Sequence, residues 1–288
     1  MEWNEIKKIA IVGSGSMGTQ IAIQCALFGY ETLIYARSEA SKERANTQIL
    51  KYFDIINSSK KWKEEKQSAA KSRLHISSNL EKTVADANII IESVVEEVEV
   101  KKETFQKISA VCRPDAIVAT NTSTFVPSMF LEKIRYPENF AAIHFHSYVW
   151  SSTIVELMPH EKTNQSTIKT LQKFAGKIGQ IPIMMKKESH NYVFNSIMTE
   201  INKAALSLVV NEVSTIKDID LAWRGILKIS IGPFGLMDMI GLDTIYHVNE
   251  YWAERTNDKQ LKKNSKFLRT YIDAGKLGMK TGEGFYKY

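Results

Sequence analysis

The segment 13–18, with the sequence Gly-Ser-Gly-Ser-Met-Gly, has the composition and spacing to bind the phosphates of a dinucleotide. It follows an apolar run and precedes residues with helical apolar spacing, the context that this motif requires. Gly13 would allow a tight turn, Gly15 would admit a pyrophosphate, and Gly18 would let helix and strand pack closely. An ordinary glycine turn is the alternative, but the flanks favour a cofactor site. The expected cofactor-binding residues are Gly13, Gly15, Ser16, Met17 and Gly18.

The residues at the end of the next apolar run bear on which dinucleotide is bound. An NAD-dependent protein usually has a carboxylate there, which binds the ribose 2′-hydroxyl. This chain has Ala36-Arg37-Ser38 instead, which leaves room for a 2′-phosphate and supplies a cation and a hydroxyl group. We expect NADP(H) to be favoured, with Arg37 as a ligand. The alternative is that Arg37 stacks on the adenine and the cofactor is NAD(H).

Strand and helix patterns alternate up to about residue 188. Apolar runs separated by amphipathic segments are typical of a parallel sheet with helices on both faces. We expect strands at 7–12, 32–36, 88–92, 116–120, 141–145, 154–158 and 181–185, and helices at 39–56, 98–111 and 166–177. The lysine-rich stretch 58–71 is either the solvated face of a helix or loop or a site for phosphates.

The pattern changes near Glu188. Apolar residues then recur every three or four positions from Val193 to Leu208, which predicts a long amphipathic helix. Further helices are expected at 215–225, 242–255 and 260–274, without strands between them. We therefore expect an α/β Rossmann-type dinucleotide-binding domain at 1–188 and an all-α C-terminal domain at 189–288.

The composition excludes several classes of protein. Of the 288 residues 44% are hydrophobic and 24% are charged, which argues against a disordered chain, a collagen-like repeat and a membrane bundle. The N-terminus lacks the features of a secretory signal, so a cytoplasmic location is expected. Cys25 and Cys112 offer neither a disulfide framework nor metal-ligand spacing, and no metal is expected. The net charge of +6 is mild and spread out, which argues against a nucleic-acid partner.

Further motifs follow the glycine loop in order along nearly the whole chain. They are Glu96 with Lys101, Thr120-Asn121-Thr122-Ser123, His144-Phe145, Val155-Glu156, Tyr192-Val193-Phe194-Asn195, Gly232-Pro233-Phe234 and the segment 280–286. With these motifs the chain resembles the 3-hydroxyacyl-CoA dehydrogenase family, which includes 3-hydroxybutyryl-CoA dehydrogenases. The resemblance implies an NAD(P)-dependent oxidoreductase of fatty-acid metabolism that interconverts 3-hydroxyacyl-CoA and 3-oxoacyl-CoA, with short acyl chains.

The resemblance also implies roles for particular residues. His144 would be the general acid and base, since its ordinary pKa lies near neutrality, and Glu156 would orient its imidazole and stabilise its charge. Catalysis would involve His144, Glu156, Ser123 and Asn195, the last two by binding the reacting oxygen. The residues expected beside the cofactor are Glu96, Lys101, Ser123, Ser147 and Lys280. The helical domain would contribute to the substrate site and would join two subunits in a homodimer.

The chain departs from the family after His144. The family commonly reads His-Phe-Phe-Asn-Pro, whereas this chain reads His144-Phe145-His146-Ser147-Tyr148. Ser147 takes the place of an asparagine that contacts cofactor or substrate, and the strand parity of His146 would turn it toward the same pocket as His144. The same chemistry on a hydroxy acid, sugar acid or diketo compound without CoA is therefore a second hypothesis. A dinucleotide-binding protein without catalysis is a third.

Overall fold

The computed structural model describes residues 6–288 and divides after Val193 into two compact units. The division lies a few residues beyond the boundary at 188 expected from the sequence. Within the described residues, no helix is both long and apolar enough to cross a membrane.

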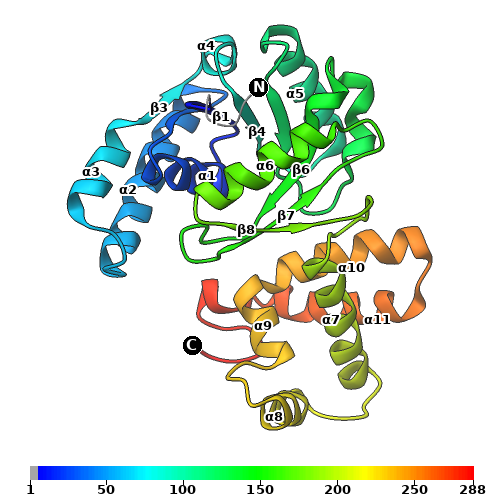
Figure 1. The fold of residues 1–288 in the computed structure, drawn as a ribbon. Coiled ribbons are helices and arrows are strands. Elements are labelled where there is room, and N and C mark those ends of the chain that lie inside the picture. The colour runs from blue at the N-terminus through cyan, green and yellow to red at the C-terminus, as the bar shows by residue number, and fades with distance from the viewer. Residues whose placement is uncertain (1–5) are drawn as a thin grey trace. The chain divides into compact units, whose positions relative to one another are not determined.

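The first unit is built on one sheet, which has eight strands in the described part of the chain (Figure 1). Its strand order is β3-β2-β1-β4-β5-β6-β7-β8. The strands are β1 (Lys8–Val12), β2 (Glu31–Tyr35), β3 (Leu74–Ser77), β4 (Ile89–Glu92), β5 (Ile117–Thr120), β6 (Phe140–Phe145), β7 (Ile154–Met158) and β8 (Ile181–Met184). All neighbours pair in parallel except β6 and β7, which pair antiparallel. The expected Rossmann-type α/β fold is thus confirmed.

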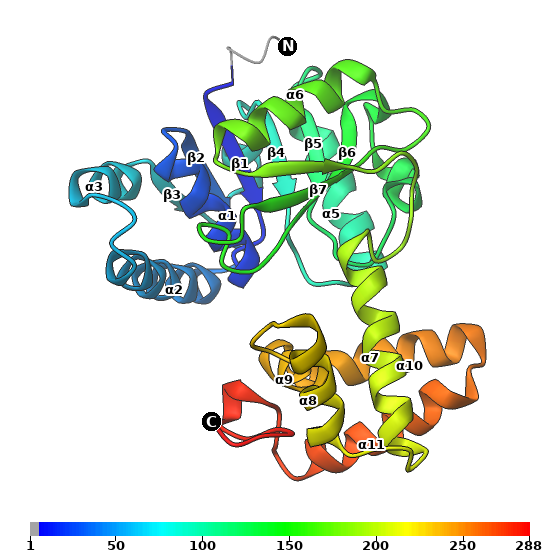
Figure 2. The same ribbon diagram turned by 60° about the horizontal axis from the view of Figure 1, so that its bottom comes forward.

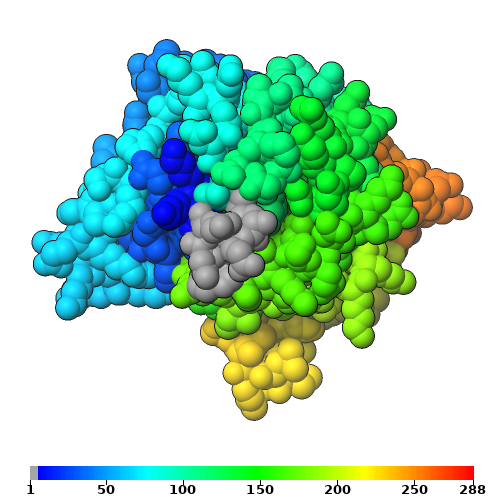
Figure 3. All heavy atoms as spheres, turned by 45° about the horizontal axis from the view of Figure 1, so that its top comes forward, coloured from blue at the N-terminus to red at the C-terminus, as the bar shows by residue number. Residues whose placement is uncertain are grey.

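Helices pack against the sheet of the first unit. The helices are α1 (Ser16–Leu27), α2 (Glu39–Ser58), α3 (Glu64–Ser72), α4 (Leu80–Val84), α5 (Val98–Val111) and α6 (Gln165–Lys177), and short 3₁₀ turns form at Pro127–Lys133 and Pro137–Asn139. Figures 1 and 2 show α1 and α6 on the same face of the sheet, where their apolar side chains join one core with those of β1, β4 and β6. In Figure 3 the blue and cyan first part of this unit lies beside its green second part.

The second unit is all helical, as expected. It contains α7 (Phe194–Val210), α8 (Ile216–Leu227), α9 (Pro233–Ile240), α10 (Leu242–Thr256), α11 (Lys259–Asp273) and a 3₁₀ turn at Met279–Thr281. A buried carboxylate, Asp238, accepts hydrogen bonds from the backbone N–H groups of Phe285 and Tyr286 (both 2.9 Å) and from the hydroxyl of Tyr288 (2.9 Å). The C-terminal segment is therefore held to this unit by hydrogen bonds to a charged group.

Three elements were not expected from the sequence. The edge strand β3 has partly exposed side chains and pairs only with β2, so it lacks a continuous apolar run. Helices α4 and α9 are five and eight residues long, too short for helical periodicity to stand out. Both cysteines are buried and free, in agreement with a core role.

Candidate active site

The glycine loop is shaped by two close backbone approaches. Gly13 has φ +125°, and a Cβ atom added there would lie 2.2 Å from the carbonyl oxygen of Ser93. A Cβ added at Gly18 would lie 2.0 Å from the carbonyl oxygen of Gly13. The glycine loop can therefore approach β4 and α1 this closely only with glycine at both positions.

Gly15 differs from the other two glycines of the loop. It has an extended backbone with φ −76°, and no atom lies within 4 Å of an added Cβ. The space above it is open, and it directly precedes the free N–H groups at the start of α1. This open backbone at a helix N-terminus has the properties of a pyrophosphate site.

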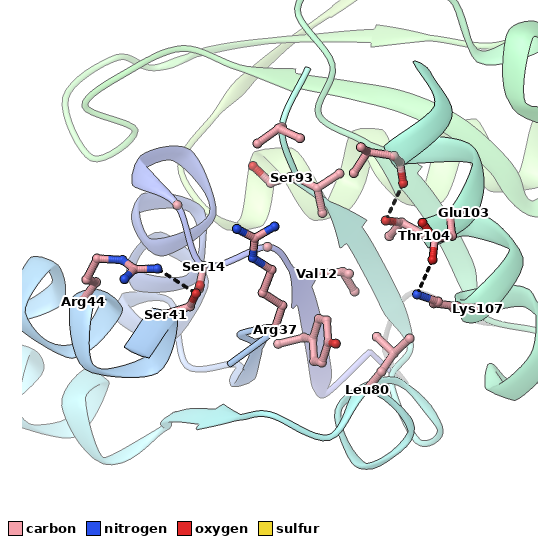
Figure 4. A pocket seen from close by; sticks show the side chains of 16 residues that line it. Val12, Ser14, Arg37, Ser41, Arg44, Leu80, Ser93, Glu103, Thr104 and Lys107 are labelled. Atoms are coloured by element: carbon pink, nitrogen blue, oxygen red, sulfur yellow. Dashed lines mark hydrogen bonds and ion pairs between the residues drawn. The ribbon is translucent and has the colours of Figure 1, made fainter. Parts of the chain in front are cut away.

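A cavity of about 460 Å³ adjoins the loop (Figure 4). Its walls come from the ends of β1, β2 and β4 and from the sides of α2 and α5, and include Val12, Gly13, Gly15 and Arg37. The volume lies in the range of small-molecule and cofactor sites. The glycine loop and the cavity beside it are together suited to bind the adenosine half of a dinucleotide.

Two arginines lie in this cavity beyond the end of β2. Figure 4 shows Arg37 between the Ser41–Arg44 pair and the side chains of α5. Arg44 Nη2 donates to Ser41 Oγ (2.8 Å), which lies 3.0 Å from the hydroxyl of Ser38. Among residues 6–288, no carboxylate forms an ion pair with either arginine. Two cations and two hydroxyl groups thus gather beyond the end of β2.

The acidic residue nearest in sequence, Glu39, is engaged elsewhere. It accepts a hydrogen bond from Ser78 Oγ (2.9 Å) and lies 3.4 Å from Lys42 Nζ. The hydrogen bond from Ser78 and the charge of Lys42 hold the pKa of Glu39 below its usual value. Ala36 is buried and offers no polar side chain. No carboxylate at this strand end is therefore directed to a ribose 2′-hydroxyl.

The ammonium of Lys101 is buried between two carboxylates. Its Nζ atom lies 2.8 Å from Glu92 Oε1 and 3.1 Å from Glu96 Oε2, and its side chain is only 1% exposed. Burial opposes the charge, but the two carboxylates outweigh this effect and raise the pKa of Lys101. Glu92 in turn accepts a hydrogen bond from Thr120 Oγ1 (2.7 Å). Lys101 thus pairs with carboxylates inside the protein, and its expected place beside the cofactor remains a prediction.

Glu96 also restrains the loop that contains Ser123. Its Oε1 atom accepts hydrogen bonds from the backbone N–H groups of Ser123 (2.9 Å) and Thr124 (3.0 Å), and from the hydroxyl of Thr122. The backbone at Ser123 is thereby fixed, while residue 123 itself remains exposed. A charged acceptor for three donors is a strong local restraint.

His144 and Glu156 form a buried pair on neighbouring strands. They are register partners in the antiparallel β6–β7 pair, and His144 Nδ1 lies 2.9 Å from Glu156 Oε2. Glu156 Oε1 accepts a hydrogen bond from the N–H of Val193 (2.9 Å), and the ring of Tyr192 lies 4.6 Å from that of His144. Burial lowers the pKa of His144, and the hydrogen bond with Glu156 opposes this effect without cancelling it.

Asn121 joins the Ser123 loop to the end of β6. Its Oδ1 atom accepts a hydrogen bond from the N–H of Phe145 (2.9 Å), and its own N–H donates to the carbonyl of Glu92 (2.8 Å). The ends of β4, β5 and β6 are thus tied together beside the glycine loop. The carboxyl ends of parallel strands are where ligands bind in open α/β sheets.

The segment after β6 lies against the start of α1. Ser147 Oγ donates to Met17 Sδ (3.6 Å), and the N–H of Tyr148 donates to Gln20 Oε1 (2.6 Å). Tyr148 has φ +59°, a left-handed conformation that is unusual for tyrosine. Ser147 is thereby placed beside the glycine loop, and its expected role at the cofactor remains a prediction.

His146 also contacts Glu156. Its Nε2 atom lies 3.3 Å from Glu156 Oε2, and its ring lies 4.6 Å from the ring of His144. The prediction from strand parity placed His146 toward the same pocket, and these distances agree with it.

Two predicted site residues lie in the second unit. Asn195 lies in α7, and Lys280 lies in the turn Met279–Thr281, where its Nζ atom is 2.6 Å from Asp243 Oδ1. Their roles at cofactor or substrate remain predictions. Sequence reasoning gave no role to Glu92 and named Tyr192 only as part of a family motif. A glutamate directly after three buried isoleucines was a signal for Glu92, but nothing in the sequence marked the ring contact of Tyr192.

The chain is similar to known proteins over nearly its whole length. Residues 8–189 match the family described as "3-hydroxyacyl-CoA dehydrogenase, NAD binding domain", and residues 192–288 match its C-terminal domain. A probable 3-hydroxyacyl-CoA dehydrogenase of Caenorhabditis elegans and a 3-hydroxybutyryl-CoA dehydrogenase of Bradyrhizobium diazoefficiens are each 30% identical, over 98% of this chain and 96% of theirs.

Solved structures show the same likeness. A diketoreductase studied with dicarbonyl compounds superimposes with a TM-score of 0.93, at 30% identity and over 98% of this chain and 99% of that one. The (S)-3-hydroxybutyryl-CoA dehydrogenase PaaH1 from Ralstonia eutropha has a TM-score of 0.88, at 27% identity and over 99% of both chains.

Substitution of Gly15 tests the phosphate loop. We expect Gly15→Leu to fold with unchanged thermal stability, because its backbone angles suit any residue and no atom opposes the side chain. The leucine would fill the space needed by the pyrophosphate, so the Kd for NAD(P)H should rise at least about tenfold, which corresponds to about 1.4 kcal/mol. Fluorescence titration measures it. Gly176→Ala, another glycine with open surroundings, is the control, and equal affinity of both variants would contradict the assignment.

Proposed function

The chain belongs to the 3-hydroxyacyl-CoA dehydrogenase family, and from this premise we propose that it interconverts short-chain 3-hydroxyacyl-CoA and 3-oxoacyl-CoA. A nicotinamide dinucleotide, when bound, supplies the acceptor or donor of the hydride. The observation that carries the proposal is the buried pair of His144 Nδ1 and Glu156 Oε2, 2.9 Å apart. Histidine held by a carboxylate is a common acid–base device, and here it lies near the cofactor-binding end of the sheet.

His144 moves the proton in the proposed reaction. Because Nδ1 is engaged by Glu156, the free atom of the ring is Nε2. In the oxidation, Nε2 accepts the proton of the substrate hydroxyl while the C–H bond at C3 breaks; in the reduction, Nε2 returns that proton to the oxygen. Glu156 fixes the tautomer and stabilises the imidazolium. Burial lowers the pKa of His144, which favours the neutral form that accepts a proton.

Ser123 and Asn195 are proposed to bind the reacting oxygen. In support of Ser123, Glu96 restrains its backbone through the hydrogen bond of 2.9 Å while the residue stays exposed. Hydrogen bonds to that oxygen gain strength as charge develops on it, so a fixed donor stabilises the transition state. Asn195, at the start of α7, is carried over from the family motif.

A dicarbonyl compound without CoA is the second candidate substrate. Two observations favour it: the TM-score of 0.93 with a diketoreductase, and the departure from the family motif at His146, Ser147 and Tyr148. Such a substrate would have the same reacting carbonyl and would need the same proton transfer by His144. The two candidates therefore differ in the part of the substrate that carries or lacks CoA.

Turnover of acetoacetyl-CoA tests the function. We expect the protein to oxidise NADPH or NADH in its presence, followed by loss of absorbance, and His144→Gln to lower kcat about 10²–10⁴-fold. His75→Gln, which changes a half-exposed histidine on β3, should retain activity. Reduction of a 3-oxo ester but not of acetoacetyl-CoA would favour the second candidate. Absence of turnover with both, despite cofactor binding, would refute the proposed function.

NADP(H) is proposed as the preferred cofactor because of Arg37 and Arg44. Replacement of both by alanine should raise the KM for NADPH about tenfold or more, since hydrogen bonds to charged groups contribute about 1.5–3 kcal/mol. The KM for NADH should change little. Lys107→Ala is the control: it removes a cation from the opposite wall of the same cavity, where Lys107 pairs with Glu103. An equal effect on both cofactors, or an unaltered NADPH KM, would show that the arginines do not select the 2′-phosphate.

We also propose a cytoplasmic location and a homodimer formed through the helical unit. In support of the dimer, α8 exposes Leu221, Ile226 and Leu227, with Ile226 78% exposed. Exposed apolar clusters commonly mark protein interfaces. Sedimentation equilibrium should show a dimer for the wild type and a monomer for Ile226→Asp with Leu227→Lys. Leu50→Asp on α2 changes an exposed leucine of the other unit and should leave the dimer intact. A monomeric wild type would refute the proposal.

A further inference from the structure

Three donor atoms converge where β6 meets β7. His144 Nδ1 lies 2.9 Å, and His146 Nε2 lies 3.3 Å, from the same atom, Glu156 Oε2. Ligand atoms from the three side chains all lie within 4.8 Å of one another. In a tetrahedral site with metal–ligand distances near 2.1 Å, ligand atoms are separated by about 3.4 Å. The two measured separations, 2.9 and 3.3 Å, lie close to that value.

The donor set also indicates the kind of ion. Two imidazoles and one carboxylate are a common three-ligand set for Zn²⁺ with a fourth position open. Imidazole nitrogen favours Zn²⁺, Cu²⁺ and Ni²⁺, whereas Mg²⁺ and Ca²⁺ favour oxygen ligands. The cluster is therefore suited to a divalent transition metal rather than to a hard cation.

The surroundings hold the ligands in place. Glu156 Oε1 accepts the hydrogen bond of Val193, which fixes the carboxylate and leaves Oε2 directed at the histidines. The strand register fixes His144 against Glu156. The segment after His146 is anchored by the hydrogen bond of 2.6 Å from the N–H of Tyr148 to Gln20 Oε1.

Access is possible from one side. The side chain of His146 is 21% exposed, whereas those of His144 and Glu156 are 4% and 1% exposed. An ion from solvent would thus meet His146 first and then the buried pair.

We propose that His144, His146 and Glu156 form a binding site for Zn²⁺ or a similar divalent transition metal, and that the bound ion inhibits the protein. Cysteine spacing alone had predicted no metal, and it does not bear on histidine and glutamate ligands. His146 stands where the family motif commonly has phenylalanine, which cannot bind a metal, so the site is a property of this chain.

The inhibition follows from the chemistry of imidazole. A metal at Nδ1 leaves the ring proton on Nε2, so that Nε2 has no lone pair to accept the proton of a substrate hydroxyl. The ion also takes the Glu156 oxygen that would stabilise the imidazolium. This part of the inference rests on the proposed function, whereas binding of the metal does not.

Direct binding to the full-length protein tests the site. Calorimetry with Zn²⁺, and the visible absorption of Co²⁺ as a probe, should show one ion per chain in the wild type. His146→Phe should bind at least tenfold more weakly. His75→Gln is the matched control, because His75 pairs with Glu31 at 2.6 Å without a third ligand, and it should bind like the wild type. His146→Gln serves as a second variant with a polar side chain, and circular dichroism checks the folding of each.

Two results would overturn the site: no ion bound by the wild type, or equal affinity of the wild type and both His146 variants. Inhibition is measured separately, each protein against its own rate in the presence of EDTA. Wild-type turnover should be inhibited at a Zn²⁺ concentration at least tenfold lower than that needed for His146→Phe, and Mg²⁺ should not inhibit. Binding without inhibition would refute the blocked proton transfer. Binding by a protein that turns over no candidate substrate would uphold the site while the proposed function fails.

Discussion

The antiparallel pairing of β6 with β7 is the constraint on which the proposed chemistry depends. It reverses the direction of an otherwise parallel sheet and sets His144 directly opposite Glu156. Opposite residues of an antiparallel pair have their side chains close together on one face. A buried imidazole and a buried carboxylate would each be costly alone, but at 2.9 Å they satisfy each other. The same register sets Nδ1 of His144 toward Glu156, which leaves Nε2 for the proposed proton transfer.

A second buried charge positions the neighbouring loop. Lys101 needs carboxylate partners because a buried ammonium without a partner would be strongly destabilising. Glu92 and Glu96 meet that need, at 2.8 and 3.1 Å, and the remaining oxygens of the same carboxylates organise the ends of β4 and β5. The ammonium thus acts on Ser123 through Glu96. In this arrangement the stability of the loop and the placement of a proposed substrate ligand have one physical cause.

Local patterns allowed much of the fold to be predicted, and long-range pairs were harder to predict. The glycine loop and the isoleucine-rich strands are contiguous in sequence, so their signals survive without knowledge of the fold. The resemblance to a family supplied His144 with Glu156. Neither source indicated that Lys101 is buried, because that depends on Glu92 and Glu96 meeting it across a strand end. The sequence also did not indicate that Arg44 lines the cavity. Arg44 lies on α2, beyond the strand end where cofactor-binding residues were expected.

His146 changes the electrostatics of the pair that His144 forms with Glu156. Two imidazoles compete for one carboxylate oxygen, and the nearby His146 opposes the charged form of His144 that Glu156 favours. A phenylalanine at this position would impose neither effect. Burial is the main cause of the lowered pKa of His144, and the charge of His146 acts in the same direction, so the neutral imidazole is favoured. A buried imidazole whose neutral form is favoured is suited to accept a proton, and imidazole nitrogens beside a carboxylate are also donors that a transition metal binds.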